Sequence, residues 1–169
     1  MRILGICGSL QARSSNLTLL HTARAMAPEG VELVVYDGIR ELPLFNPDIE
    51  ASGAPPAVRE WRRAIAVSDA LLIASPEYGH SLPGALKNAI DWVIGSGELE
   101  RKIVGVTAAT VSPERGRLGL QALRGTLAAV SARVVGGEPI ARGPSFEREL
   151  AALLGALIDA ARAGPTSEP

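Results

Sequence analysis

Residues 3–16 form the stretch that decides the fold, and they read ILGICGSLQARSSN. The run at 3–7 is apolar and has the length of a buried strand, and Gly8 and Ser9 end it. Polar residues then precede 16–26, where apolar side chains recur at helical spacing. A buried strand that leads through a polar loop into a helix is the opening of a strand–helix–strand unit, which builds parallel sheets.

The same alternation continues along the chain without an internal repeat or a change in composition. Further strands are predicted at 31–36, 70–74, 102–108 and 133–135, and further helices at 57–68, 83–94, 117–131 and 147–162. Apolar runs between helices indicate an α/β fold, with a five-stranded parallel sheet of order 2-1-3-4-5 and helices on both faces. Residues 1–162 are predicted to form a single domain, residues 39–56 a long irregular connection, and residues 163–169 a disordered tail.

Composition excludes several classes of function. The 169 residues are 47% hydrophobic and 21% charged with a net charge of −1, which is typical of a soluble globular protein. The near-neutral charge and the few aromatic residues argue against nucleic-acid binding. Cys7 is the single cysteine, and His21 and His80 stand far apart, so neither a disulfide framework nor a structural zinc site is expected. We expect a cytoplasmic protein with no membrane span, since no apolar run reaches about 18 residues.

The loop at 8–16 has the composition of an anion site. In doubly wound sheets, ligands bind at the carboxyl ends of the strands near the point where strand order reverses. This loop offers short hydrogen-bonding side chains, Arg13, and the N–H groups of a helix N-terminus, and such donors bind phosphate monoesters. Helix capping by one of the residues 14–16 is the structural alternative, but it leaves the donors that begin at Ser9 unexplained.

The same loop fits the C-x5-R-[ST] pattern of the low-molecular-weight tyrosine phosphatases. Cys7 would then be a thiolate nucleophile, and Arg13 would clamp the phosphate. That family takes its leaving-group acid from an Asp-Pro pair late in the chain, which this sequence lacks, and Glu138 with Pro139 is a poor substitute. A phosphatase that uses Cys7 and Arg13 remains an alternative, and we favour Cys7 as a core residue.

A second loop follows the strand at 70–74, and residues 75–92 read SPEYGHSLPGALKNAIDW. Pro76 and Gly79 indicate a rigid turn, Ser81 is a natural helix cap, and Pro83 suits a first helical turn. Such a loop exposes backbone amides beside an aromatic ring, that of Tyr78, and it suits the polar edge of a flat heterocycle.

Both loops resemble motifs of the NADPH-dependent FMN reductase family. The first resembles the motif GSLRxxSxN, and residues 76–92 resemble PEYN-x-S-x-PG-x-LKNAIDW. The resemblance implies a flavodoxin-like three-layer sandwich that binds FMN and uses NADPH or NADH as co-substrate. It also implies a set of cofactor-binding residues. Ser9, Ser14 and Asn16 would bind the phosphate together with amides of the first helix, and the same loop adds Gln11, Arg13 and Ser15 to the candidate set. Pro76, Glu77, Tyr78 and His80 would line the isoalloxazine, with Gly79 among them as a backbone position. A third loop at 110–116 loosely resembles a glycine-rich family loop and would contribute Ser112 and Gly116.

Two positions depart from the family pattern. The family's arginine falls on Gln11, and its usual asparagine falls on Gly79. We therefore expect either that Arg13 supplies the missing cation or that FMN is held less tightly.

The implied activity needs no catalytic residue or metal, since the flavin carries the chemistry. Hydride would pass from NAD(P)H through bound FMN to a flavin, quinone, azo or metal-oxyanion acceptor in a ping-pong cycle. The alternatives are a flavodoxin-type electron carrier and a regulatory member that has lost the flavin. Similar proteins are homodimers or homotetramers, and here the helix at 86–94 is expected to supply apolar contacts.

Overall fold

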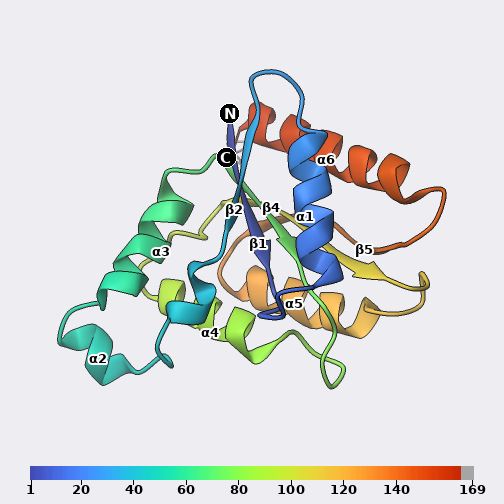
Figure 1. Ribbon diagram of the computed structural model, residues 1–169. Helices are drawn as coiled ribbons and strands as arrows, with labels where there is room; N and C mark the ends of the chain where they lie inside the picture. The colour runs from blue at the N-terminus through green and yellow to red at the C-terminus, as the bar shows by residue number, and fades with distance from the viewer. Residues whose placement is uncertain (165–169) are drawn as a thin grey trace.

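The computed structural model describes residues 1–164 as one parallel sheet enclosed by helices (Figure 1). The strands are β1 (Arg2–Cys7), β2 (Glu32–Tyr36), β3 (Ala70–Ala74), β4 (Ile103–Thr110) and β5 (Arg133–Ala141). The helices are α1 (Ser15–Ala25), the 3-10 helix η1 (Gly38–Glu41), α2 (Pro47–Ala51), α3 (Pro56–Ala66), α4 (Gly84–Ile94), α5 (Arg117–Ala129) and α6 (Phe146–Ala163). Helix α6 includes Ala163, the first residue of the expected tail, and residues 165–169 lie outside the described part of the chain.

The strand order is β2-β1-β3-β4-β5, and all four pairings are parallel, which confirms the predicted sheet. Register aligns the ends of β1 and β3 with Thr107 of β4, since Cys7 pairs with Ala74 and Ala74 pairs with Thr107, and β4 continues to Thr110. The loops that follow these three strands therefore leave the same edge of the sheet side by side.

Two apolar cores lie on opposite faces of the sheet. One core packs α1 and α6 against the sheet through residues such as Leu19, Leu20 and Leu157. The other packs α3, α4 and α5 against the opposite face, and it contains the fully buried Trp61 and Trp92. Burial on both faces explains why the central strands are nearly continuous apolar runs.

The last strand is longer than predicted. The predicted strand ends at residue 135, but β5 continues to Ala141 through a bulge at Gly136 and Gly137. Val106 pairs with Gly136 and Ala108 with Pro139, so β5 carries one extra residue there. Both glycines have positive φ, 74° and 111°, which a bulge accommodates and which glycine adopts readily. The bulge carries the chain on to Arg142 at the carboxyl edge of the sheet.

The segment at 39–56 is more ordered than the predicted irregular connection. It contains η1 and α2, and it is fastened to α4 by side-chain hydrogen bonds. Asn88 donates through Nδ2 to the Pro43 carbonyl oxygen (2.9 Å) and accepts from the Phe45 amide (2.7 Å). Trp92 Nε1 donates to the same Pro43 carbonyl at 2.8 Å.

The helix α4 does not present the apolar face that was expected to join subunits. Its apolar side chains at 86, 89, 90, 92 and 93 are buried against the chain's own sheet and neighbouring segments. Of its large apolar residues, Ile94 is exposed, at 54%. The amphipathic pattern of α4 is therefore accounted for by packing within one chain.

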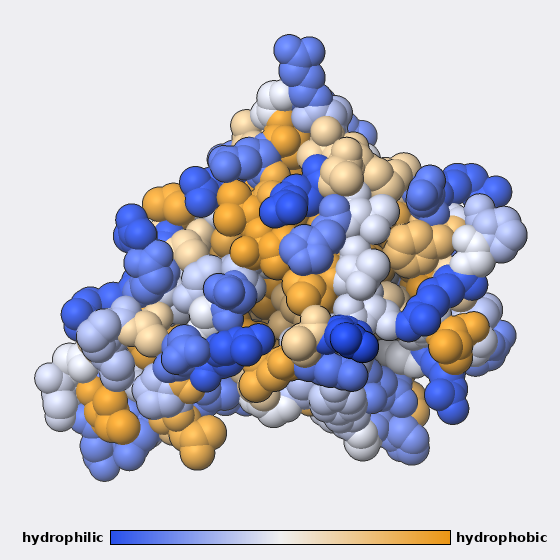
Figure 2. All heavy atoms as spheres, viewed as in Figure 1, coloured by the Kyte–Doolittle hydropathy of each residue, from blue (hydrophilic) through white to orange (hydrophobic). Residues whose placement is uncertain are grey.

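The surface drawn in Figure 2 is mainly polar, with apolar atoms in the band between α1 and α3, where the edge strand β2 runs. None of the helices in residues 1–164 combines the length and apolar character of a bilayer-spanning helix.

Candidate functional site

Three loops meet at the carboxyl edge of the sheet: residues 8–14 after β1, 75–83 after β3 and 111–116 after β4. They are the loops in which the sequence predicted the chemistry. Four of the eight exposed large apolar side chains lie in or beside these loops, namely Leu10, Tyr78, Val111 and Leu118. The edge therefore combines polar loop backbone with apolar side chains that the chain itself leaves uncovered.

The first loop curls over the N-terminus of α1 and keeps its hydroxyls inside. Ser14 is the N-cap, and its Oγ accepts from the Asn16 amide at 3.2 Å. Ser9 Oγ accepts from the Gln11 amide, also at 3.2 Å. Ser9, Ser14 and Asn16 are all less than 9% exposed, so capping and loop closure account for two of the predicted hydroxyls.

Other donors of this loop remain free. The N–H groups of Ala12, Arg13 and Ser15 have no hydrogen-bond partner within residues 1–164. These amides lie at the positive end of α1, whose first turn contains no acidic residue. Unsatisfied amides at a helix N-terminus bind anions, because the amides and the helix dipole both favour negative charge.

The Asn16 side chain connects the first loop with β4. Its Oδ1 accepts from the Ala109 amide at 2.9 Å. Because the amide of Ala109 is a donor, the oxygen of Asn16 must face it, and the NH2 group is left to donate elsewhere. This contact explains why an asparagine suits the position: the side chain positions β4 and retains two donors for a ligand.

The family pattern has a cation at the position of Gln11, and Arg13 was expected to supply it here. Gln11 is exposed, and its backbone carbonyl accepts from the Ser14 amide at 3.1 Å. Arg13 is exposed and lines a cavity beside α1 together with Arg142, which the sequence analysis missed. Arg142 donates through Nη2 to Ser15 Oγ. The position of Arg142 depends on the bulge in β5. The sequence signal for the continued strand was the run of apolar residues at 139–141, just before Arg142.

The second loop contains a tight hairpin. Tyr78 and Ser81 exchange two backbone hydrogen bonds, 3.0 and 3.1 Å long, around Gly79 and His80. Both central residues have positive φ, 57° and 61°, as in a type I′ turn. Glycine and asparagine both tolerate this conformation, so the departure at Gly79 preserves the backbone that the turn requires.

Side chains of the second loop hold its neighbours in place. Glu77 Oε2 accepts from the Gly119 amide in the first turn of α5 at 2.9 Å, so this carboxylate is committed to a helix N-terminus. Tyr78 OH lies 3.4 Å from Ser9 Oγ, and its ring is 54% exposed. Pro76 is partly buried below them. Tyr78 is thus the aromatic surface that this edge offers to a ligand.

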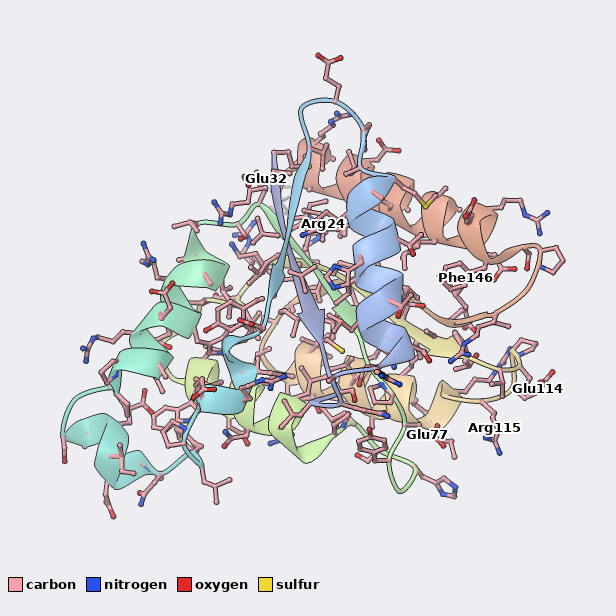
Figure 3. The ribbon with its side chains drawn as sticks, in the orientation of Figure 1. Arg24, Glu32, Glu77, Glu114, Arg115 and Phe146 are labelled. Carbon is pink, nitrogen blue, oxygen red and sulfur yellow. The ribbon has the colours of Figure 1, made fainter. Side chains whose placement is uncertain are left out.

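The third loop is folded on itself. Ser112 accepts from Thr110 Oγ1 (2.8 Å) and from the Arg115 amide (3.2 Å) through its carbonyl. The pKa of the Glu114 carboxyl is lowered, first by its hydrogen bond with the Ser112 side chain and second by a hydrogen bond with its own backbone amide. Gly116 is buried, with a φ of 88°. Figure 3 shows Glu114 and Arg115 at the periphery.

Cys7 lies in the core. It is 6% exposed, it packs with α1 and α6 against the sheet, and its Sγ lies 3.7 Å from Ser14 Oγ. A reactive cysteine needs an accessible thiolate in an electropositive setting, and the enclosed Cys7 thiol does not present one to a phosphate ester. The geometry favours the core role over the phosphatase alternative.

Comparison with known proteins identifies relatives over most of the chain. The model of the NADPH-dependent FMN reductase family matches residues 1–162. An NAD(P)H-dependent FMN reductase of Pseudomonas aeruginosa is 43% identical over 119 residues, which are 70% of this chain and 63% of that protein. An NAD(P)H:quinone oxidoreductase of Solanum tuberosum is 43% identical over 96 residues, 54% of this chain and 49% of that one.

Among solved structures, the flavoenzyme NAD(P)H:(acceptor) oxidoreductase of Paracoccus denitrificans aligns with a TM-score of 0.84 and 25% identity. The alignment covers 96% of this chain and 98% of that one. The two curated relatives are longer, and this chain spans 63% and 49% of their lengths. The match of the family model to nearly every described residue shows that the chain belongs to the NADPH-dependent FMN reductase family.

Proposed function

We propose that this chain is an FMN-dependent NAD(P)H oxidoreductase. It passes reducing equivalents from NAD(P)H through bound FMN to a small acceptor, a flavin, quinone, azo compound or metal oxyanion, in a ping-pong cycle. The observation that carries the proposal is the cradle at the N-terminus of α1, where buried polar side chains and free amides meet without an acidic residue.

The donors of this cradle fit the phosphate group of FMN. The free amides of Ala12, Arg13 and Ser15 lie at the positive end of α1, and the Asn16 NH2 group adds two further donors. A phosphate monoester carries close to two negative charges at neutral pH, and several converging donors are what it requires. These groups bind the phosphate and orient the rest of the nucleotide toward the second loop.

The second loop fits the flavin ring. The exposed face of Tyr78 and the apolar side chains of Leu10 and Val111 offer planar contact and exclude water. The hairpin at Gly79 and His80 presents backbone groups to the polar rim of the ring. Glu77 acts as a positioning residue, because its hydrogen bond to the Gly119 amide fixes the second loop against α5.

When bound, FMN supplies hydride acceptance and donation, and the protein supplies binding and orientation. This division of labour requires no protein nucleophile. Because Tyr78 is exposed, the face of the ring is open to NAD(P)H and then to the acceptor in turn.

The test is flavin binding followed by anaerobic reduction. Purified protein is mixed with FMN, and fluorescence quenching is expected to give a saturable titration, with riboflavin binding more weakly because it lacks the phosphate. NADPH or NADH should then bleach the flavin absorbance without oxygen, and 1,4-benzoquinone should restore it. Initial rates at varied quinone should give parallel double-reciprocal lines.

Two other outcomes of this test would indicate a different function. No flavin absorbance after reconstitution would contradict the reductase and favour a member that has lost its cofactor. Flavin binding without bleaching by either nicotinamide nucleotide would favour the electron carrier.

We also propose a homodimer or homotetramer, supported by the exposed apolar residues Leu10, Val111 and Leu118 at the site edge. Light scattering after gel filtration tests it, and a monomer at micromolar concentration would contradict it.

A further inference from the structure

The two outer edges of the sheet differ in how they are protected against pairing with another strand. At one edge, β5 is interrupted by the bulge at Gly136 and Gly137, and Pro139 has no backbone N–H to donate. The side chain of Arg124 also lies against this strand, because a Cβ at Gly137 would meet its Cδ at 2.8 Å. Bulges and prolines keep edge strands from pairing, so the β5 edge is unsuited to a further strand.

The other edge, formed by β2, has none of these devices. The register between β1 and β2 is unbroken from Glu32 to Tyr36, and β2 contains neither proline nor glycine. The Glu32 amide donates to the Met1 carbonyl, and alternate residues of a parallel strand point to opposite sides. The N–H and C=O groups of Leu33 and Val35 therefore point away from the sheet. A regular edge with outward backbone groups is a template for another strand.

The side chains of β2 are apolar and only partly covered. Val34, Val35 and Tyr36 are all partly exposed, and no residue of β2 after Glu32 is charged. Figure 2 shows the apolar surface that runs along this strand between α1 and α3. Unpaired edge strands usually carry charged side chains that prevent association, and β2 does not. Backbone and side chains of β2 are thus both suited to a partner strand.

We propose that a second copy of this chain docks against β2, with the two β2 strands antiparallel across a two-fold axis at Val34. A two-fold contact between identical chains uses the same surface on each. Leu33 then lies opposite Val35 of the second copy, and their outward N–H and C=O groups exchange hydrogen bonds. Val34 faces its own counterpart in the non-hydrogen-bonded pair, where side chains approach most closely. The two sheets continue as one.

This inference rests on one part of the proposed function, the homo-oligomer, and it assigns the surface that joins the copies. It does not depend on flavin binding. The β2 contact is also separate from the exposed apolar residues at the carboxyl edge, so a chain could use both surfaces at once.

Charges at the two ends of β2 complement each other in this arrangement. Leu33 and Val35 pack on the α1 side of the sheet, and Asp37, which is exposed, follows on the same side. Arg24 is exposed in the last turn of α1, at the edge where β2 begins. Neither Arg24 nor Asp37 forms an ion pair within residues 1–164. Antiparallel pairing brings residue 37 of one copy level with residue 31 of the other, and so Asp37 toward Arg24 at both ends of the contact.

Disulfide cross-linking tests the register directly. In a Cys7→Ser background, which removes the single cysteine, Val34→Cys places two thiols across the axis. Their Cα atoms would be about 4.5 Å apart, within the range of about 4.4–6.8 Å that a disulfide spans. Glu32→Cys is the matched control, because its counterpart would lie about 13 Å away along the strand. Under mild oxidation the Val34→Cys dimer should form at least about tenfold faster on a non-reducing gel.

Charge reversal tests the orientation with the native cysteine in place. Arg24→Asp and Asp37→Arg should each raise the dissociation constant of the dimer about tenfold, measured by sedimentation velocity. The double variant Arg24→Asp/Asp37→Arg should return to within about threefold of wild type, because the pairs are restored with exchanged signs. Arg148→Asp, on the exposed side of α6, is the matched control and should leave the dissociation constant unchanged.

The results separate this inference from the rest of the proposed function. A chain that stays monomeric at every concentration would overturn both the β2 contact and the proposed homo-oligomer. A dimer with equal cross-linking rates at 34 and 32, or without rescue by the double variant, would overturn the β2 contact alone. Flavin titration and reduction by NADPH are measured independently, and their failure would leave a cross-linked and charge-rescued dimer as support for the β2 contact.

Discussion

The N-termini of α1 and α6 emerge at the same edge of the sheet, but they are equipped in opposite ways. Helix α6 carries Glu147 and Glu149 in its first turn, so its own side chains neutralise its positive end. Helix α1 carries no acid there, and it receives the guanidinium of Arg142 at Ser15. The acids of α6 compensate its own positive end, whereas the uncompensated end of α1 supports our proposal that an external anion binds there.

Helix α5 shows an intermediate solution. Its first turn has no acidic residue of its own, and Glu77 of the second loop supplies the carboxylate to the Gly119 amide. The Glu77 carboxylate thereby compensates part of the positive end of α5, and the same bond fixes a loop that we assign to the flavin ring. The positive end of a helix can be compensated by its own first turn, as in α6, or by a neighbouring loop, as in α5. We propose that a ligand has this role at α1.

The largest effect is expected when the first turn of α1 is given an acidic residue like those in the first turn of α6. Ser15→Glu places a carboxylate beside Arg142 at the first helical position. We expect FMN to bind about 100-fold more weakly, because the new charge repels the phosphate and occupies the cation. The free energy of unfolding should rise by about 0.3–1 kcal/mol, because an acid at a helix N-terminus is stabilising. Flavin titration and urea unfolding measure the two effects.

The matched control for this change is Thr22→Glu, which adds the same charge to the last turns of α1. There the helix dipole has the opposite sign, so stability should fall slightly while the affinity for FMN stays unchanged. A loss of FMN affinity as large as that of Ser15→Glu would mean that net charge, and not the helix end, decides binding.

The next prediction tests the α5 end through its backbone. A Cβ at Gly119 would lie 2.9 Å from the Cβ and 3.0 Å from the Cα of Glu77. Gly119→Ala should therefore displace the second loop and lower the free energy of unfolding by about 1–3 kcal/mol, despite the better helix propensity of alanine. Gly125→Ala in the same helix meets nothing within 4 Å and should stabilise by about 0.5–1 kcal/mol. Equal effects of the two substitutions, measured by urea unfolding, would contradict the contact.

Features that depend on contacts within a few residues could be predicted from the sequence, and features that depend on contacts between distant residues could not. The strand order and the first loop were predicted because the glycines, the cap at Ser14 and the apolar run all lie within a few residues. Arg142 was missed because its partner Ser15 is 127 residues away and because the glycines of the bulge resemble the end of a strand. The hydrogen bond between Glu77 and the Gly119 amide could not be inferred from the sequence for a similar reason, since the two residues are 42 positions apart. Short-range patterns indicate elements and turns, whereas contacts between loops depend on register and bulges.

A smaller effect is expected when α5 loses its carboxylate. Glu77→Gln retains an oxygen that can accept from the Gly119 amide but removes the negative charge at the helix end. The free energy of unfolding should fall by about 0.3–1 kcal/mol. FMN affinity should change by less than about threefold if the loop keeps its position. A tenfold loss of affinity with unchanged stability, in the same two assays, would move Glu77 from a positioning residue to a direct ligand.

The smallest expected effect comes from α6, and it completes the comparison. Glu147→Gln removes one of the two acids in the first turn and should lower the free energy of unfolding by about 0.3–1 kcal/mol at low salt. Added salt should reduce the difference, because Glu147 is exposed and its field is screened. Flavin affinity should remain within about threefold of wild type, because Glu149 still neutralises this helix end. A clear gain in FMN affinity would show instead that the N-terminus of α6 also faces the phosphate.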